Sequence, residues 1–424
     1  MKYMVIYNRK DNKKLTICAI GSSESSHIVS RVKCFAERGH HVYLICSIVT
    51  GLEGVTEIVP QVVPVKWLHT IFNLVDTFST KLLKRSIMNY EDIAYLLYNY
   101  LCILKQCKPD IVHIHYAYSI WAWMAAVTSY PLVVSIMGGD VLFDEQGSPT
   151  PRGKWLTRQL LKSADLITSK SDYLITVLDK LGGFGSKAIK VVWGVDLARF
   201  QPVDTTALRA QLGLSSQHRI ILSPKILQPF YNVHLIVEAM PDILAACPEA
   251  RLLITEYVAD PDYRKQIIER IEQLDIQDSV MFVGHIPHHE MPLYYSLAEI
   301  TVAVPSSDGL PQTLFEGMAC AVPNILSRLP RYEEAVTHEE SAYFVESSPR
   351  DIAAGVLRLF SDRALSARIA QNGLAIVKVQ ADFSQEVSRV ESKYAEILRR
   401  PRKWRNLLTR ARILREVSRY FIQP

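Results

Sequence analysis

The sequence lacks the residue patterns that mark several common protein classes. Its 424 residues contain seven cysteines, which are scattered and form no C-x-x-C pair, so a disulfide framework is disfavoured and free thiols in a reducing cytosol are expected. No G-x-G-x-x-G follows an expected strand, and neither a P-loop nor the residue order of a Ser/His/Asp triad is found. These absences disfavour a nicotinamide dehydrogenase and give no support to P-loop or triad chemistry.

The sequence is also short of long hydrophobic runs and of a general basic excess. Charged residues interrupt the apolar runs of residues 1–20, so no secretory signal is expected. Residues 111–139 contain no Asp, Glu, Lys or Arg, but histidines and a proline divide them into strand, helix and strand, which favours a buried β-α-β unit over a membrane span. The net charge of +5 comes from residues 399–424, with nine Lys or Arg and one Glu, so a nucleic-acid-binding surface is not expected.

Apolar runs of strand length alternate with longer helical patterns in two successive series. The first series predicts strands at 16–20, 42–46, 111–115, 132–136, 166–169 and 189–192. The second series predicts strands at 220–223, 252–255, 280–283, 300–304 and 324–326. Helices fit between them, for example at 28–37, 92–106, 120–129, 233–246, 262–274, 287–297 and 314–319. An α/β fold follows, with two domains that meet near residues 193–202 and share a cleft at the carboxyl ends of their strands.

One segment combines a turn, a helix start and two carboxylates. The expected strand at 300–304 stops at Pro305, and S-S-D-G-L-P-Q-T-L-F-E-G-M-A follows at 306–319. Free N–H groups at the helix start attract a phosphate, and Glu316 is placed to accept hydrogen bonds from sugar hydroxyls. The segment therefore predicts a site for a molecule with both phosphate and sugar, although a surface turn capped by Asp308 is the plainer alternative.

This segment resembles the E-x7-E motif of retaining glycosyltransferases of family four, with Asp308 at the first Glu and Glu316 at the second. Further similar motifs follow in the family's order: the helix and G-H-x-V entry at 26–42, K-P-D-I-V-H-I-H at 108–115, S-I-M-G-G-D-V at 135–141, S-A-D-L-I-T at 163–168 and V-V-W-G-V-D-L-A-R-F at 191–200. The resemblance extends to about residue 398. It implies the GT-B fold, which is two Rossmann-like domains with an interdomain cleft, and transfer of a sugar from a nucleotide donor with retention.

The resemblance also implies a division of the chain. Residues 1–198 would form a Rossmann-like acceptor-side domain, 199–382 a nucleotide-sugar-binding domain, and 383–424 a helix that returns to the first domain plus a basic amphipathic tail. The acceptor would be a glycan or a lipid-linked molecule of cell-surface polysaccharide or glycolipid synthesis. The expected location is the cytoplasm, peripheral at the inner face of the cell membrane.

The family neutralises the leaving diphosphate with an Arg and a Lys after the first strand of the second domain, without a metal, so the resemblance implies no cofactor. Lys225 occupies the usual Arg position and keeps the charge, whereas Tyr231 occupies the usual Lys position and supplies only a neutral hydroxyl. Asp308 is expected to bind donor-sugar hydroxyls, and Glu316 the ribose. The other donor-binding candidates around them are Gly309, Leu310, Gln312 and Thr313.

Candidates also lie at other expected strand ends. In the second domain, Gly284 and His285 follow the third strand, where the family holds the base through backbone groups, while His288 is expected to be solvated. In the first domain, His115 ends one strand and Asp140 follows another, and both are catalytic candidates.

Two further positions of the first domain bear on donor binding. Met137 stands where many family members carry a histidine that touches the donor sugar, and methionine cannot replace its hydrogen bond. Gly21 would let the donor approach the backbone closely.

The tail is predicted to be a basic amphipathic helix over residues 403–421, with Trp404, Leu407, Leu408 and Phe421 among its apolar residues. It either binds an anionic membrane surface through residues 399–421 or packs on the first domain. Two alternative functions stay open: a catalytically weak GT-B binding or scaffold protein, which Tyr231 and Met137 favour, and a nucleotide-sugar epimerase.

Overall fold

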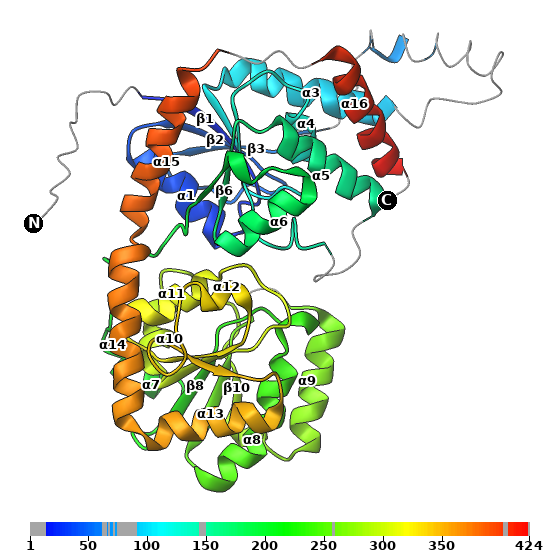
Figure 1. Ribbon diagram of the computed structural model, residues 1–424. Helices are drawn as coiled ribbons and strands as arrows, with labels where there is room; N and C mark the ends of the chain where they lie inside the picture. Colours follow the sequence, from blue (N-terminus) through cyan, green and yellow to red (C-terminus); the bar gives the residue numbers. More distant parts are fainter. Residues whose placement is uncertain are drawn as a thin grey trace, which may run out of the picture.

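The computed structural model describes residues 14–61, 66, 68–70, 73, 91–143, 150–256, 259–401 and 406–422. These residues form two domains, each built on one parallel sheet with helices on both sides (Figure 1). The N-terminal sheet has the order β3-β2-β1-β4-β5-β6-β7. Its strands are β1 (Thr16–Ile20), β2 (His41–Ile45), β3 (Val55–Ile58), β4 (Ile111–Ile114), β5 (Leu132–Ser135), β6 (Leu166–Ser169) and β7 (Ala188–Lys190). Its helices include α1 (Ser26–Glu37), α3 (Glu91–Cys107), α4 (Ile120–Ala125), α5 (Pro151–Ser163) and α6 (Asp172–Gly182).

The C-terminal sheet has the order β10-β9-β8-β11-β12-β13. Its strands are β8 (Arg219–Ser223), β9 (Ala250–Ile254), β10 (Val280–Phe282), β11 (Ile300–Ala303), β12 (Asn324–Ser327) and β13 (Tyr343–Val345). The helices around it include α7 (Thr206–Gln211), α8 (Val233–Ala246), α9 (Pro261–Gln273), α10 (Met291–Leu297), α11 (Gln312–Ala319), α12 (Pro330–Glu333) and α13 (Pro349–Ser361).

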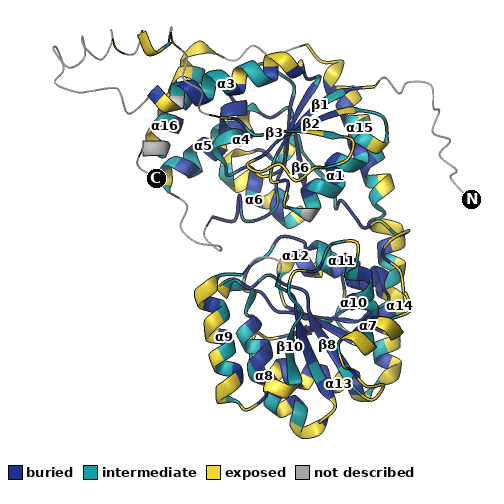
Figure 2. Cartoon of the chain, turned by 180° about the vertical axis from the view of Figure 1, so that it is seen from behind, coloured by how far each residue is buried: buried dark blue, intermediate teal, exposed yellow. Residues whose placement is uncertain are grey.

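The strands lie in the buried centre of each domain (Figure 2). Every residue of β4, β5, β6, β11 and β12 is buried, because helices cover both faces of the sheets, and this is why these strands are continuous apolar runs in the sequence. The strand order changes direction between β1 and β4 in one sheet and between β8 and β11 in the other. Loops diverge at these two points, so the carboxyl ends of these strands are where a ligand site is expected.

Two consecutive helices, α14 (Arg363–Gln380) and α15 (Phe383–Leu398), carry the chain from the C-terminal domain back to the N-terminal domain along one side (Figure 1). At the junction the N–H of Val195 donates to the carbonyl of Ala381, and the side chain of Asp382 caps α15. The inner face of α15 is buried against β1 and α1 through Val387, Val390, Tyr394 and Ile397. The last helix, α16 (Leu407–Ile422), packs on α4 and α5.

The α/β fold with two Rossmann-like domains is confirmed, and every predicted strand is present within two residues of its expected bounds. The edge strands β3 and β13 were not predicted; in β3 the sequence is V-T-E-I and none of its residues is fully buried, so it is not a continuous apolar run. The helices expected at 120–129 and 287–297 are shorter than predicted. In the second, Pro287 and Glu290 form a turn that delays the start of α10 to Met291. No helix in the described ranges is long and apolar enough to cross a membrane.

Candidate active site

The segment with the two carboxylates lies after β11, at the point where the order of the C-terminal sheet changes direction. Pro311 has an extended backbone and occupies the cap position, so α11 begins at Gln312 with no side-chain cap for its first N–H groups. Leu314, Phe315 and Met318 anchor the helix in the domain core. This anchoring holds Asp308 in the loop and Glu316 on the helix at the carboxyl edge of the sheet.

Glu316 is a buried carboxylate with two side-chain partners. Nε2 of His288 lies 2.8 Å from Oε1, and the hydroxyl of Tyr295 on α10 donates to Oε2 at 2.9 Å. The expectation that His288 is solvated is wrong, because the turn before α10 brings its ring against α11. These partners fix the orientation of a carboxylate that retains lone pairs for ribose hydroxyls.

Lys225 and Asp308 form an ion pair after β8 and β11. Nζ of Lys225 lies 2.6 Å from Oδ2 of Asp308, and the hydroxyl of Tyr332 on α12 donates to the same oxygen at 3.0 Å. Tyr231 lies beside the pair, with its ring centroid 5.2 Å from Nζ. Burial, together with the charge of Asp308, raises the pKa of Tyr231 far above its ordinary value, so its hydroxyl stays neutral. The structure thus gathers three separately predicted residues into one cluster.

Two glycines let the domains touch next to this cluster. A Cβ added at Gly309 would overlap the carbonyl oxygen of Met137, and one added at Gly138, whose φ is +121°, would lie 3.0 Å from the Gly309 nitrogen. In the N-terminal domain, Asp140 fixes the loop after β5. Its buried carboxylate accepts hydrogen bonds from the backbone N–H groups of Ala117 at 2.7 Å and of Gly138 at 3.0 Å. Both carboxylate oxygens of Asp140 are therefore engaged by backbone.

His115 lies directly after β4, beside a buried arginine that the sequence analysis missed. Nη1 of Arg31 lies 3.5 Å from Nδ1 of His115, and because a guanidinium only donates, the neutral ring carries its proton on Nε2. That Nε2 has no hydrogen-bond partner among the described residues. Burial, then the neighbouring His113 and Arg31, lower the pKa of His115 well below its ordinary value. His113 is a core histidine that contacts Ser135 and Tyr394.

Lys170 is a second buried cation that the sequence analysis missed. It follows β6 directly and is only 4% exposed. Burial, with Arg31 and Lys225, lowers its pKa to about 7, while Asp308 and Glu316 act in the opposite direction. Two signals in the sequence could have identified these cations. Lys170 is a charged residue at the carboxyl end of a buried strand, and Arg31 stands between Ile28 and Val32 on the buried face of α1.

Comparisons with known proteins agree with this geometry. Residues 25–199 match the family described as Glycosyltransferase Family 4, and residues 204–375 match the family described as Glycosyl transferases group 1. The chain belongs to the family-four, group 1 glycosyltransferases. The family predicted from the sequence motifs is therefore confirmed.

Relatives of this glycosyltransferase span most of its length. It is 24% identical to an N-acetyl-alpha-D-glucosaminyl L-malate synthase of Bacillus anthracis over 375 residues, which cover 87% of this chain and 92% of the relative. It is 24% identical to an alpha-monoglucosyldiacylglycerol synthase of Streptococcus pneumoniae over 275 residues, 60% of each chain. The crystal structure of Anabaena HepE in complex with UDP and glucose has a TM-score of 0.73 at 16% identity, covers 90% of this chain and all of HepE, and shows the same fold.

The other predicted donor-binding residues of this glycosyltransferase lie around the same sheet edges. Gly21 follows β1, where an added Cβ would lie 2.7 Å from Cδ1 of Ile28. The side-chain amide of Gln312 donates to the carbonyl of Gly194 in the interdomain linker, which ties the start of α11 to the N-terminal domain. The residues next to it differ in exposure: Leu310 is buried and Thr313 is partly exposed.

The predicted base-binding residues lie after β10. Gly284 has a φ of +69°, and its carbonyl accepts the N–H of Glu256. The side chain of His285 is exposed to solvent. Their roles remain predictions from the family resemblance.

Proposed function

We propose that this glycosyltransferase moves a sugar from a nucleotide-sugar donor to a glycan or lipid-linked acceptor, with retention at the anomeric carbon and without a metal ion. The observation that carries the proposal is the Lys225–Asp308 ion pair beside the start of α11, with the buried carboxylate of Glu316 on the same helix. In this arrangement the ammonium of Lys225 and the free N–H groups of α11 can bind a diphosphate. The carboxylates of Asp308 and Glu316 can bind the hydroxyls of the donor sugar and of the ribose.

In the proposed reaction the bond between the anomeric carbon and the phosphate oxygen breaks, and both electrons go to that oxygen. The ammonium of Lys225 and the first N–H groups of α11 stabilise the charge that develops on the diphosphate. The acceptor oxygen bonds to the anomeric carbon on the face that the leaving group vacates, and its proton passes to a departing phosphate oxygen. This front-face substitution retains the configuration and needs no nucleophilic side chain.

The proposed donor is a uridine diphosphate sugar. The support is the fold that this chain shares with HepE, whose crystal structure contains UDP and glucose. In this proposal Glu316 binds the ribose hydroxyls, Asp308 binds the sugar hydroxyls, and the backbone at Gly284 and His285 holds the base.

The neutral Tyr231 favours a second candidate function, a catalytically weak scaffold protein, and a nucleotide-sugar epimerase is the third. Release of nucleoside diphosphate from a panel of nucleotide sugars, with lipid and glycan acceptors present, separates the three. We expect turnover of one donor, and a loss of about tenfold or more in Glu316→Gln and Lys225→Met, or about 1.4 kcal/mol in the barrier.

Two exposed residues give matched controls for that experiment. Glu333 on α12 pairs only at the surface, and Lys180 on α6 is exposed, so Glu333→Gln and Lys180→Met are expected to turn over at the wild-type rate. Absence of turnover for every donor would establish the scaffold function instead. Conversion of one nucleotide sugar into its epimer, without sugar transfer, would establish the epimerase.

We further propose that the acceptor is lipid-linked and that α16 binds an anionic membrane, which would place the protein on the inner face of the cell membrane. One face of α16 is buried on the N-terminal domain through Ile413 and Val417, whereas Leu407 and Leu408 are each 78% exposed. Three arginines on its outer side, Arg412, Arg415 and Arg419, are also exposed. Residues 402–405 and the side chain of Phe421, also part of the predicted amphipathic helix, lie outside the described residues.

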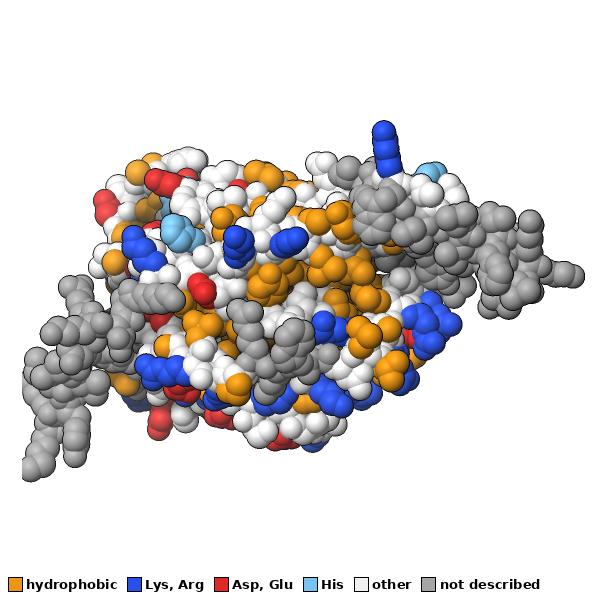
Figure 3. Space-filling model, turned by 90° about the horizontal axis from the view of Figure 1, so that it is seen from above, with side chains coloured by type: hydrophobic (Ala, Val, Ile, Leu, Met, Phe, Trp, Pro, Cys, Tyr) orange, Lys and Arg blue, Asp and Glu red, His pale blue; other side chains and the backbone are white. Residues whose placement is uncertain are grey.

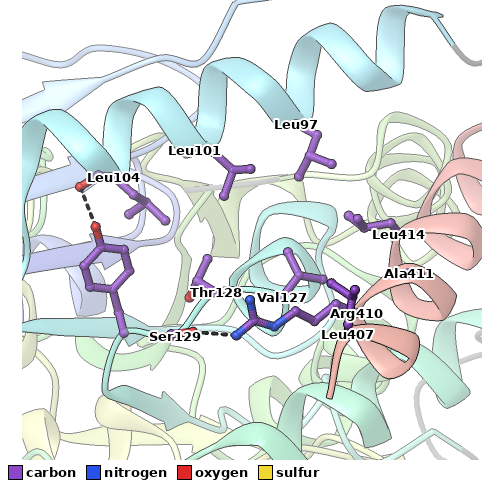
Figure 4. Close-up of a pocket in the computed structure, with 11 residues that line it drawn as sticks. Leu97, Leu101, Leu104, Val127, Thr128, Ser129, Leu407, Arg410, Ala411 and Leu414 are labelled. Atoms are coloured by element: carbon purple, nitrogen blue, oxygen red, sulfur yellow. Dashed lines mark hydrogen bonds between the residues drawn. The ribbon is translucent and has the colours of Figure 1, made fainter. Parts of the chain in front are cut away.

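A hollow beside α16 adds apolar surface to the same region. A cavity of about 390 Å³ lies between α3 and α16, with Leu97 and Leu101 directed into it from α3 and Arg410 reaching the hydroxyl of Ser129 at its edge (Figure 4). The end of the molecule that faces away from the C-terminal domain shows hydrophobic side chains next to Lys and Arg (Figure 3). Apolar side chains bordered by cations suit a surface of anionic lipid.

A further inference from the structure

Several cations are buried where the two domains meet. Arg331 on α12 is one of them, with its guanidinium over the ring of Tyr173 on α6. Of the other three, only one has an anionic partner among the described residues. Arg31, Lys170 and Lys225 are 1%, 4% and 5% exposed. Lys225 pairs with Asp308, but in the described part of the chain no hydrogen bond or ion pair of the Lys170 ammonium is found. Arg31 contacts the ring of His115, the sulfur of Met137 and the face of an indole, and none of these is an anion.

Buried cations without anionic partners are costly. Transfer of a charge from water into a protein interior is strongly unfavourable unless an opposite charge or hydrogen-bond acceptors compensate for it. Nη2 of Arg31 and Nε2 of His115 are both donors without a partner among the described residues. Unsatisfied buried donors on two neighbouring side chains indicate a ligand that supplies acceptors.

These buried cations adjoin the proposed donor site. Lys170 follows β6, the neighbour of β5 in the sheet, and β5 leads into the loop of Gly138 that touches Gly309. The charge of Lys170 interacts across the domain boundary with Lys225, Asp308 and Glu316. A ligand that lies between these two carboxylates, as the donor diphosphate does in the proposed function, is therefore within reach of the Lys170 charge.

We propose that Lys170 and Arg31 form the N-terminal half of the binding site for the donor diphosphate. This inference rests on the proposed function and deepens it. Lys225 and α11 bind the diphosphate from the C-terminal domain, and Lys170 supplies from the opposite domain the positive charge that Tyr231 does not. The diphosphate is then bound by both domains, so its binding holds them together over the reacting bond.

The experiment compares the affinities of nucleoside diphosphates and monophosphates for the full-length protein by calorimetry. The probes are the di- and monophosphates of uridine, guanosine, adenosine, cytidine and thymidine. The ratio of the two affinities isolates the contribution of the β-phosphate, and a purely structural role of a side chain would not change it. We expect this ratio to fall by about tenfold or more in Lys170→Met and in Arg31→Met. Lys180→Met, an exposed lysine of α6, is the control and should keep the wild-type ratio.

The pH dependence gives a second readout for Lys170. Its pKa of about 7 means that the free protein loses this proton above pH 7 and must regain it to bind the anion. The groups that face it are His27 and Arg31 on α1, Lys225 after β8, Asp308 before α11 and Glu316 on α11. We expect the diphosphate affinity of the wild type to fall more steeply above pH 7 than that of Lys170→Arg, because arginine stays charged.

The outcomes separate this inference from the proposed function. A wild type that binds a diphosphate, together with a Lys170→Met variant whose affinity ratio is within about twofold of the wild type, overturns the inference and leaves the proposed function standing. A wild type that binds none of the diphosphates overturns both. A Lys170→Met variant that binds diphosphate normally but loses affinity only for a phosphorylated acceptor would show that Lys170 serves the acceptor, and it also overturns the inference.

Discussion

Tyr231 lies 5.2 Å, measured to its ring centre, from the ammonium of Lys225, at a position where the family usually has a second cation. Lys170, from the other domain, interacts with the same Lys225, Asp308 and Glu316. A charge can be relocated in this way because a phosphate dianion is bound by the field of nearby cations, whichever strand each of them follows. The departure at Tyr231 alone therefore does not establish a loss of activity.

A lysine placed at position 231 tests whether Lys170 supplies the charge that Tyr231 lacks. We expect Tyr231→Lys to restore diphosphate affinity when it is added to Lys170→Met, because the total number of cations at the site is then the same as in the wild type. In the wild-type background the same change should improve affinity little, since a third ammonium repels Lys170 and Lys225. Titration of the four proteins with UDP measures this. Equal effects of Tyr231→Lys in both backgrounds would show that the two positions do not share a role.

At the scale of elements, two loops of the two domains touch through backbone at their glycines. The loop after β5 and the loop before α11 touch at Gly138 and Gly309, and the amide of Gln312 joins α11 to the linker at Gly194. Met137, whose carbonyl oxygen lies against Gly309, contributes shape here rather than a hydrogen-bonding side chain to the sugar. Small changes in these loops should therefore affect domain contact before they affect either domain core.

The substitution Gly309→Ala tests the contact between these two loops directly. Its Cβ would overlap the carbonyl oxygen of Met137, so the two loops must separate, although the φ of Gly309 is not in the left-handed region. We expect donor turnover to fall by about tenfold or more while the melting temperature stays close to that of the wild type. Ser306→Ala, an exposed change in the same loop, is the control. Wild-type turnover by Gly309→Ala would contradict a role for this contact.

The proposed membrane binding of α16 can be tested by substituting its exposed leucines. We expect Leu407→Ser with Leu408→Ser to abolish most co-sedimentation with vesicles that contain anionic lipid, because about 25 cal/mol is lost for each Å² of apolar surface that no longer enters the lipid. Leu398→Ser, at the exposed end of α15, is the matched control. Equal binding of the double variant and the wild type, or equal binding to neutral and anionic vesicles, would exclude the proposed membrane contact.

At the scale of the whole molecule, α14 and α15 bind the two domains to each other away from the site. Glu391 on α15 lies 2.8 Å from Nη1 of Arg38 and 3.0 Å from Nε2 of His40, both after α1. Burial by itself would raise the pKa of Glu391, but the hydrogen bond from His40 and the charge of Arg38 lower it below 4.5 overall. A carboxyl with a lowered pKa stabilises the fold above its unfolded pKa, and this stabilisation is lost as the pH falls through the folded pKa.

Glu391→Gln should therefore lower the free energy of unfolding by about 1 kcal/mol at pH 7. The difference from the wild type should shrink as the pH is lowered from 7 to below the folded pKa of Glu391, since the wild-type carboxyl then becomes protonated as well. Thermal unfolding of both proteins at the two pH values measures this. Glu396→Gln removes an exposed pair with Lys393 on the same helix and is expected to change little. A deficit of the same size at both pH values would show that charge is not the cause.

Much of the fold could be predicted from the sequence, because parallel strands buried on both faces are continuous apolar runs that stand out from amphipathic helices. The strands β6 and β11 are examples, since all four residues of each are buried. The loop with Asp308 and the helix with Glu316 could also be located, because a strand that stops at a proline and a helix start are local features. The edge strands β3 and β13 were missed; β3 lies at the edge of its sheet with no fully buried residue, so its V-T-E-I is not a continuous apolar run.

Only the tertiary structure decided which of these residues meet. The ion pair of Lys225 with Asp308 and the contact of His288 with Glu316 join segments that are 83 and 28 residues apart. For Arg31 and Lys170 the local signals were only a position on the buried face of α1 and one at the end of a buried strand, and their burial near the carboxylates of the other domain follows from strand order and domain contact. The sequence determined most of the helices and strands and the family, because local residue patterns indicate both. The charge balance of the site depends on distances between residues in space, and local patterns do not give these distances.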